Sequence, residues 1–267
     1  MLKKNVIQLF LDPYIYNLLT NETTKIPLKA ENLSPLKYFG LSEVDWSPDG
    51  TKLAIFGQPM EKPDLAGIWI LDLNDYSMKR ISNGETMSWS PDGKRIAVIE
   101  TQPLTHSQIK IITNQNHEEK TVYQFDHESG WDLEIAWSAI GEDLVVSVPE
   151  TTAECYARKT LYRLNLKESS FVPVFENPQW SMDHPEWLPN GNWIVFIAKS
   201  SIGGTVSVTP ISGECLFAWL PKIKGADFID VTEDGKKALV ISWGNLYIVD
   251  LEKAVDFSQL PEQLNCR

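Results

Sequence analysis

The sequence is poor in positive charge. Its 267 residues include 24 Lys and Arg against 36 Asp and Glu, which gives a net charge of −12 and a pI near 4.8. A protein that binds nucleic acid needs a basic face to neutralise phosphates, and anionic lipid surfaces attract basic segments for the same reason. We therefore expect neither nucleic acid nor a membrane among its partners.

Long hydrophobic runs and recognisable cysteine motifs are also missing. The most suggestive stretch, VIQLFL, is six residues long, is followed by Asp12 and Pro13, and has no small-residue cleavage site after it, so it does not have the features of a secretion signal. No stretch approaches the length of a membrane span. Three cysteines without an obvious pairing suit a reducing compartment, and we expect a cytoplasmic protein.

Common catalytic and cofactor motifs are absent as well. The chain has no phosphate-binding glycine loop, no H-E-x-x-H, no C-x-x-C and no EF-hand loop. It also lacks the G-x-S-x-G stretch that forms the nucleophile elbow of many hydrolases. We expect no cofactor and no metal ion.

What the chain does contain is one hairpin-like segment in five copies. DWSPDGTKLAIFG (45–57) and SWSPDGKRIAVIE (88–100) are the clearest copies, and weaker ones begin at Ala136, Glu186 and Asp230. A regular spacing of this size indicates a repeat architecture. Steps of 43 to 50 residues separate the turn glycines, which are Gly50, Gly93, Gly141, Gly191 and Gly235.

The chemistry of each copy predicts a tight turn between two strands. Proline presets φ at the second turn position, and glycine supplies the positive φ that closes the hairpin. A hydroxyl side chain before the turn can bond to the turn backbone. The run after each turn is apolar on both faces, which is typical of a strand covered on two sides. The hydroxyl positions are Ser47, Ser90, Ser138 and Thr232.

A second signature follows each hairpin. It is clearest in IWILDL (68–73), LYRLNL (161–166) and LYIVDL (246–251), and looser in IKIITN (109–114) and TVSVTP (205–210). A short turn and a further strand come next, so each repeat has four antiparallel strands, a to d. Repeats of this kind predict an all-β fold, a single β-propeller domain spanning residues 1–267.

The number of blades depends on the N-terminus. IYNLLT (15–20) resembles the third-strand signature and would make a sixth copy, preceded by VIQLFL as strand b. We therefore predict six blades, the first lacking strand a. Residues 260–267 would supply that strand, so that the termini close the ring. The alternative is five blades with a separate N-terminal hairpin.

The repeated WSPDG unit resembles the repeat of the TolB-like propeller family, which also occurs in the propellers of prolyl-oligopeptidase-type peptidases. The resemblance rests on WSPDGTKLAIF and WSPDGKRIAVI, supported by the three weaker copies. The motif specifies a fold and hardly any function. What the resemblance implies is therefore limited to a rigid disc used for binding. The additional N-terminal domain of TolB has no counterpart here, so the partners of TolB are not carried over.

Tryptophan falls into two sets. Four of the ten occupy one repeat position, and we expect them to pack between neighbouring blades. Trp131 and Trp180 leave this pattern and lie in the longer loops, which would share one face of a propeller. The repeat-position residues are Trp46, Trp89, Trp137 and Trp187.

Polar residues accompany the two loop tryptophans. His127, Asp132, Asp183 and His184 stand beside them, and aromatic residues exposed in loops on a rigid scaffold are common anchors of interfaces. No two of these residues have a spacing diagnostic of a metal site. We predict that all six form a recognition surface.

Two functions fit these features. The first is a non-enzymatic binding module for a protein or peptide. The alternative is a carbohydrate-active or metal-dependent enzyme, lyase-like, that uses the histidine and acidic residues of the loop face; it rests on fold analogy. The sequence indicates neither the ligand nor the oligomeric state.

Overall fold

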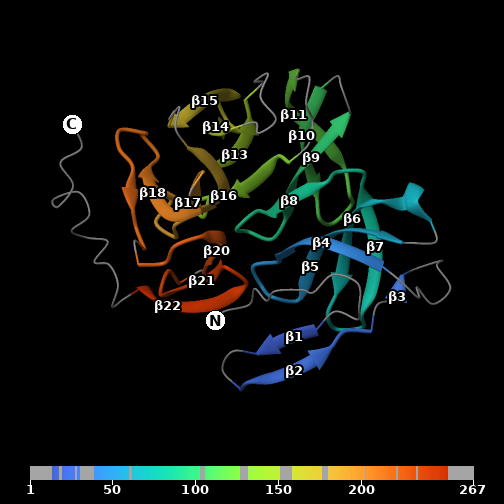
Figure 1. The fold of residues 1–267 in the computed structure, drawn as a ribbon. Coiled ribbons are helices and arrows are strands. Elements are labelled where there is room, and N and C mark those ends of the chain that lie inside the picture. Colours follow the sequence, from blue (N-terminus) through green and yellow to red (C-terminus); the bar gives the residue numbers. More distant parts are fainter. Residues whose placement is uncertain are drawn as a thin grey trace. The chain divides into compact units, whose positions relative to one another are not determined.

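The structure is a computed structural model, and its described residues are almost entirely β-strands and the turns that join them (Figure 1). The described residues are 14–17, 20–27, 29–30, 39–59, 62–102, 106–126, 132–150, 158–175, 180–201, 203–220, 222–232 and 234–251. They contain no helix long and apolar enough to cross a membrane.

The chain forms two compact units that divide between Trp131 and Asp132. The first unit holds a two-stranded sheet, a five-stranded sheet in the order β3-β7-β6-β5-β4 and a four-stranded sheet in the order β11-β10-β9-β8. Neighbouring strands are antiparallel, except that β3 pairs parallel with β7. A short 3-10 turn, η1 (Pro63–Leu65), precedes β6. The strands are β1 (Tyr14–Asn17), β2 (Glu22–Lys25), β3 (Lys29–Ala30), β4 (Phe39–Trp46), β5 (Lys52–Pro59), β6 (Gly67–Asp72), β7 (Ser77–Ser82), β8 (Thr86–Trp89), β9 (Arg95–Gln102), β10 (His106–Thr113) and β11 (Glu119–Asp126).

The second unit holds three antiparallel sheets, each following chain order: β12 to β15, β16 to β19, and β20 to β22. The last of these sheets has three strands where the other two have four. The strands are β12 (Glu134–Trp137), β13 (Asp143–Pro149), β14 (Lys159–Asn165), β15 (Ser170–Phe175), β16 (Ser181–Trp187), β17 (Trp193–Ser200), β18 (Gly203–Pro210), β19 (Phe217–Ala218), β20 (Ala226–Val231), β21 (Lys237–Ser242) and β22 (Asn245–Asp250).

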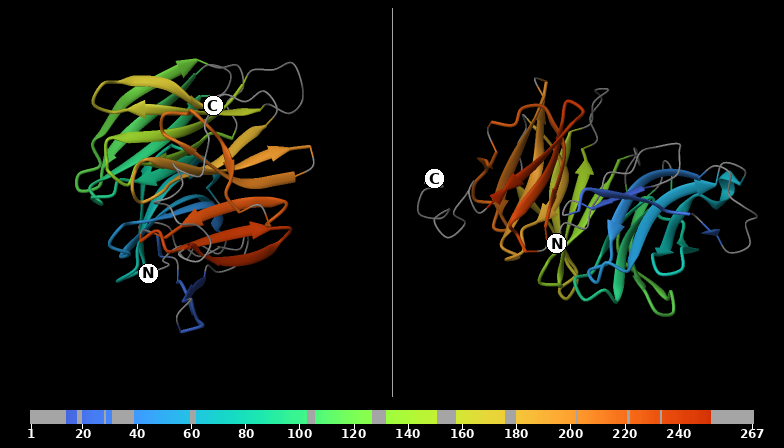
Figure 2. Two further views of the ribbon diagram at one scale, coloured as in Figure 1. Left: turned by 90° about the vertical axis from the view of Figure 1, so that its left-hand side faces the viewer. Right: turned by 90° about the horizontal axis from the view of Figure 1, so that it is seen from below.

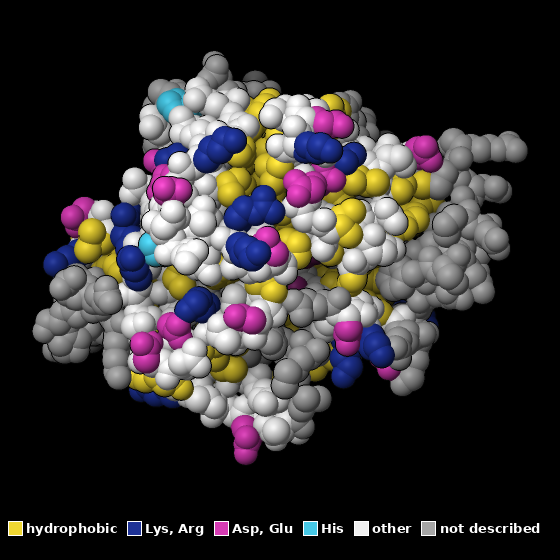
Figure 3. Space-filling model, turned by 180° about the vertical axis from the view of Figure 1, so that it is seen from behind, with side chains coloured by type: hydrophobic (Ala, Val, Ile, Leu, Met, Phe, Trp, Pro, Cys, Tyr) yellow, Lys and Arg dark blue, Asp and Glu magenta, His cyan; other side chains and the backbone are white. Residues whose placement is uncertain are grey.

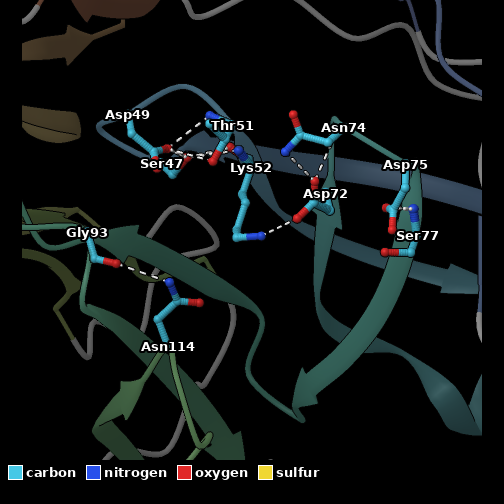
Figure 4. A network of polar contacts seen from close by, with 10 residues as sticks. All are labelled: Ser47, Asp49, Thr51, Lys52, Asp72, Asn74, Asp75, Ser77, Gly93 and Asn114. Atoms are coloured by element: carbon cyan, nitrogen blue, oxygen red, sulfur yellow. Dashed lines mark hydrogen bonds and ion pairs between the residues drawn. The ribbon is translucent and has the colours of Figure 1, made fainter.

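The predicted hairpins are confirmed in all five copies, and Figure 4 shows the first of them. Ser47 Oγ donates to Asp49 Oδ1 (2.7 Å) and accepts the N–H of Lys52 (2.9 Å). Asp49 Oδ1 in turn accepts the N–H of Thr51 (2.9 Å). Gly50 has a φ of 66°, the left-handed conformation that the turn requires. The side chains named in the repeat therefore close the turn directly.

Tryptophans at the repeat position link consecutive sheets within each unit. Trp187 on β16 donates from its indole N–H to the carbonyl of Ala136 on β12 (3.1 Å), and its ring is buried against Val145 and Leu161. Trp89 is buried in one core cluster with Ala54 of the preceding sheet. Figure 2 shows the sheets of residues 180–251 lying face to face. The predicted packing between neighbouring blades is confirmed at these positions.

The prediction of six blades is wrong: the structure has five, which was the alternative. The sequence IYNLLT does not begin a four-stranded sheet, because β1 pairs only with β2 among the described strands. All four side chains of β2 (ETTK) are exposed. A strand this polar cannot be covered on both faces as an inner blade strand is, so the segment forms a separate hairpin.

Two further expectations concern the chain ends and the cysteines. The predicted closing strand at 260–267 lies outside the described residues. Cys215 is disulfide-bonded, a pairing that the cysteine spacing in the sequence did not indicate. Cys155 and Cys266 lie outside the described residues.

Candidate functional site

A buried lysine surrounded by carboxylates lies at one end of the second unit. The ammonium Nζ of Lys159 is 2.7 Å from Asp132 Oδ2, 3.1 Å from Asp183 Oδ1 and 3.5 Å from Glu134 Oε2. The Lys159 side chain is only 4% exposed, whereas that of Asp132 is 72% exposed. The ammonium therefore lies inside the protein and holds one carboxylate that faces solvent.

The electrostatics of this group keep Lys159 charged. Burial by itself lowers the pKa of Lys159, because desolvation disfavours the ammonium. The nearby charges of Glu134 and Asp183, together with the hydrogen bond to Asp132, outweigh burial and raise the pKa above its usual range. Lys159 is thus a fixed positive charge at neutral pH, and it cannot act as a general base there.

His184 is attached to the same group through Glu134. Glu134 accepts the backbone N–H of His184 at Oε2 (2.7 Å), and its Oε1 lies 3.1 Å from Nδ1 of the imidazole. The imidazole also makes an edge contact with Phe228, with ring centroids 5.4 Å apart. This orientation turns Nε2 away from Glu134, and about one third of the side chain is exposed.

The local fold explains why these residues meet. Asp132 lies two residues before β12, Lys159 is the first residue of β14, and Asp183 stands near the start of β16. The register of β16 against β17 shifts between Asp183 and Glu186, and His184 within this irregular stretch has a φ of 50°. Bulges of this kind redirect side chains near sites. All these positions lie at the end where the longer loops connect the strands.

Trp243 is exposed at the same end of the unit. It forms a two-residue turn with Gly244 between β21 and β22, and the φ values of 51° and 73° are those of a tight hairpin turn. Its side chain is 72% exposed. One side of its ring lies on Gly225, where an added Cβ would come within 2.1 Å of the indole. The absence of a side chain at Gly225 thus leaves room for the Trp243 ring, whose other side faces solvent.

The structure brings together half of the predicted site residues. Asp132, Asp183 and His184 meet around Lys159 and Glu134. Trp180 is partly buried and packs against the core that contains Trp187. His127 and Trp131 lie outside the described residues.

Three residues of this end were missed in the sequence. Lys159 and Glu134 are the first residues of their strands, and in the sequence nothing distinguishes them from charged side chains exposed to solvent. Trp243 is part of ISWGNLYI, where a tryptophan-glycine pair between two apolar runs is the signal of a tight turn that pushes the ring outward. We call the set Asp132, Glu134, Lys159, Asp183, His184 and Trp243 the loop-end surface.

The carboxylates of the loop-end surface do not form a metal centre. In the part of the chain that the structure describes, no group of three His, Cys, Asp or Glu side chains is arranged to hold a metal ion. The physical reason lies in the cluster itself, because the Lys159 ammonium occupies the position between the carboxylates that a cation would take.

On the face drawn in Figure 3, Lys and Arg side chains alternate with Asp and Glu side chains, with no extended patch of one sign. The loop-end surface differs because three carboxylates converge on one buried cation.

Comparison with solved structures defines the class of protein: the chain has the fold of a β-propeller, and it is similar to TolB. TolB from Acinetobacter baumannii matches with a TM-score of 0.67 at 17% identity, over 90% of this chain and 57% of that one. A TolB-type protein from Agrobacterium tumefaciens matches with a TM-score of 0.68 at 16% identity, over 90% and 84%. The chain thus spans little more than half of the first of these proteins.

An enzyme with the same fold is also similar. Oligogalacturonate lyase from Vibrio parahaemolyticus matches with a TM-score of 0.59 at 12% identity, over 91% of this chain and 69% of that one. No protein-family model and no curated protein sequence matches the chain. At these identities the likeness extends to the fold alone.

Proposed function

We propose that the chain is a binding module that recognises a protein or peptide through the loop-end surface. The observation that carries the proposal is Trp243, a tryptophan that exposes 72% of its side chain in a tight turn. Large aromatic side chains on rigid supports dominate the binding energy of many interfaces.

The charged part of the surface supports the same function. Lys159 fixes the exposed carboxylate of Asp132 in place, so a partner would meet a pre-ordered acceptor and would lose little entropy on binding. Three of the residues, Asp132, His184 and Trp243, have positive φ without being glycine. Such backbone strain is found more often at functional sites than elsewhere.

A lyase-like enzyme is the second candidate, and a different observation favours it. Glu134 orients the His184 ring through Nδ1, which is how a carboxylate commonly positions a histidine that acts as a base through Nε2. The buried ammonium of Lys159 is a fixed positive charge of the kind that stabilises developing negative charge. The fold likeness to oligogalacturonate lyase is compatible with this candidate.

Capture from the native host, with the full chain as bait, tests the binding function. The test variant combines Trp243→Ala with Asp132→Asn, and the matched control is Val172→Ala, an exposed apolar side chain on β15 that is remote from the loop ends. We expect wild type and control to retain the same specific partner and the double variant to lose it. Equal capture by all three would contradict the proposal.

The enzyme candidate needs a separate assay. Wild type and His184→Ala are incubated with acidic oligosaccharides that contain uronic acids, and the unsaturated product of β-elimination is followed by its ultraviolet absorbance. Product formed by the wild type and lost in His184→Ala would favour the enzyme. Absence of product from wild type, together with partner capture, would favour the binding module.

The charge of the chain bears on the class of partner, and its disulfide bears on the location. An acidic chain with a net charge of −12 fits a protein or peptide partner better than nucleic acid or an anionic membrane. A cytoplasmic location remains a proposal, and the disulfide at Cys215 weighs against it, because disulfides persist mainly in oxidising compartments.

A further inference from the structure

Among the described strands, β22 is the outer strand of a three-stranded sheet. Its six residues, Asn245–Asp250, pair in unbroken register with β21 on one side. Figures 1 and 2 show it beyond β21, at the edge of the sheet. No described strand pairs with its other side, although the sheets β8 to β11, β12 to β15 and β16 to β19 each have four strands.

The side chains of β22 are apolar and exposed. Leu246, Tyr247 and Ile248 are 50%, 44% and 49% exposed. Because consecutive residues of a strand point to opposite faces, apolar surface is exposed on both faces of this edge. The residues 245–249 carry no charge.

The other outer strands are protected against edge pairing. β7 is covered by β3, and β19 has only two residues. The register of β11 skips Val122 and that strand carries Lys120, while the register of β15 skips Val174 and that strand contains Pro173. Bulges, lysine, proline and short length are the devices that keep sheet edges from pairing. β22 has none of them.

We infer that β22 of one molecule pairs antiparallel with β22 of a second copy, so that two sheets join across a two-fold axis. This edge adjoins Trp243 of the loop-end surface, which lies in the turn before β22, but the inference does not depend on the proposed function. A two-fold axis perpendicular to the sheet keeps each side chain on its own face, so the axis must lie midway between the two copies of one residue, which then face each other.

Centring the axis on Tyr247 makes the strand complementary to itself. Leu246 then lies opposite Ile248 of the second copy, and the two tyrosines face each other. Apolar and aromatic cross-strand pairs of this kind stabilise a sheet. Moving the axis to Ile248 would place Leu246 opposite Asp250 of the second copy. The sequence of the strand therefore favours a single register.

Sedimentation velocity of the full chain over a range of concentrations tests the inference. A single strand pair buries less surface than the roughly 1,200–2,000 Å² of a stable interface, so we expect a dimer that dissociates on dilution. Tyr247→Lys should abolish it, because two lysines would face each other across the axis. Val172→Lys makes the same change on the protected edge β15 and should leave the dimer intact.

Three results would overturn the inference. One is a monomer at every concentration, and another is a dimer that persists in Tyr247→Lys. The third is strong hydrogen-exchange protection of the Leu246 and Ile248 amides, which alternate with those that face β21, that does not vary with concentration, since this would mean that the chain's own residues cover the edge. Should Tyr247→Lys fail to fold, the double variant Leu246→Thr with Ile248→Thr keeps the strand propensity and should weaken the dimer.

Discussion

The ammonium of Lys159 lies 3.1 Å from Asp183 Oδ1, and both side chains are buried. Removing the cation would leave the buried Asp183 with only the longer contact to Lys199 Nζ (3.9 Å), and the partly buried Glu134 with only His184. We predict that Lys159→Met destabilises the chain by about 3–5 kcal/mol at pH 7, the usual cost of breaking a buried ion pair from one side. Chemical denaturation followed by tryptophan fluorescence measures it.

The loss should depend on pH in a definite direction. In Lys159→Met the carboxylates lose this cation, so the difference in the free energy of unfolding between the variant and wild type should shrink as the pH falls and the carboxyl groups become neutral. The double variant Lys159→Met with Asp183→Asn should recover part of the loss at pH 7. A loss that is the same at pH 4 and pH 7 would show that packing, and not charge, accounts for the effect.

In the wild type the same lysine affects alkaline stability. Its folded-state pKa is raised above the ordinary value of 10.5. The stabilising contribution of Lys159 is therefore complete below pH 10.5 and is lost as the pH rises through the folded-state pKa. Thermal unfolding across the alkaline range should show a decline in wild type that is smaller in Lys159→Met.

A carboxylate also links neighbouring sheets of the first unit. Asp45 Oδ2 accepts the backbone N–H of Trp89, 44 residues later, at 2.7 Å. We predict that Asp45→Ala costs about 1.5–3 kcal/mol, the range for hydrogen bonds to charged groups, and that Asp45→Asn costs less because an acceptor remains. Denaturant midpoints of the two variants provide the comparison. Equal losses would mean that the accepted hydrogen bond is not the reason.

The turns offer a test of backbone strain without steric conflict. Gly93 has a φ of 68°, and an added Cβ would approach no atom closer than Pro48 Cδ at 3.8 Å. Gly93→Ala should therefore cost about 1–2 kcal/mol through the left-handed backbone alone. Trp89→Ala should cost more, about 3–5 kcal/mol, because it removes a large buried ring. The reverse order of the two losses would contradict the assignment.

Hairpins could be predicted because every part of their chemistry is local. Ser47, Asp49 and Gly50 close their turn within a few residues, so the sequence motif and the structural motif coincide. The loop-end surface was predicted only in part, because its members come from β12 and the residues just before it, from β14 and β16, and from the turn between β21 and β22. Nothing near Lys159 in the sequence indicates that Asp183 lies beside it.

The N-terminal hairpin shows the limit of pattern matching. IYNLLT matches the third-strand signature, yet burial decides whether such a segment joins a blade, and its partner strand ETTK is too polar to be covered. Cys215 shows another limit. A disulfide depends on the three-dimensional approach of two distant cysteines, which no spacing in the sequence reveals.

The two tryptophans Trp180 and Trp243 should respond oppositely to substitution. Trp180 packs against the core around Trp187, so Trp180→Ala should lower the unfolding midpoint measurably. Trp243 is exposed, and Trp243→Ala should change the free energy of unfolding by no more than about 0.5 kcal/mol. If Trp243 anchors a partner, its replacement should nevertheless abolish capture from the host, because exposed aromatic anchors contribute to binding and little to folding. A stable Trp243→Ala protein that still captures the same partner would remove Trp243 from the loop-end surface and leave Asp132 and His184 as its exposed part.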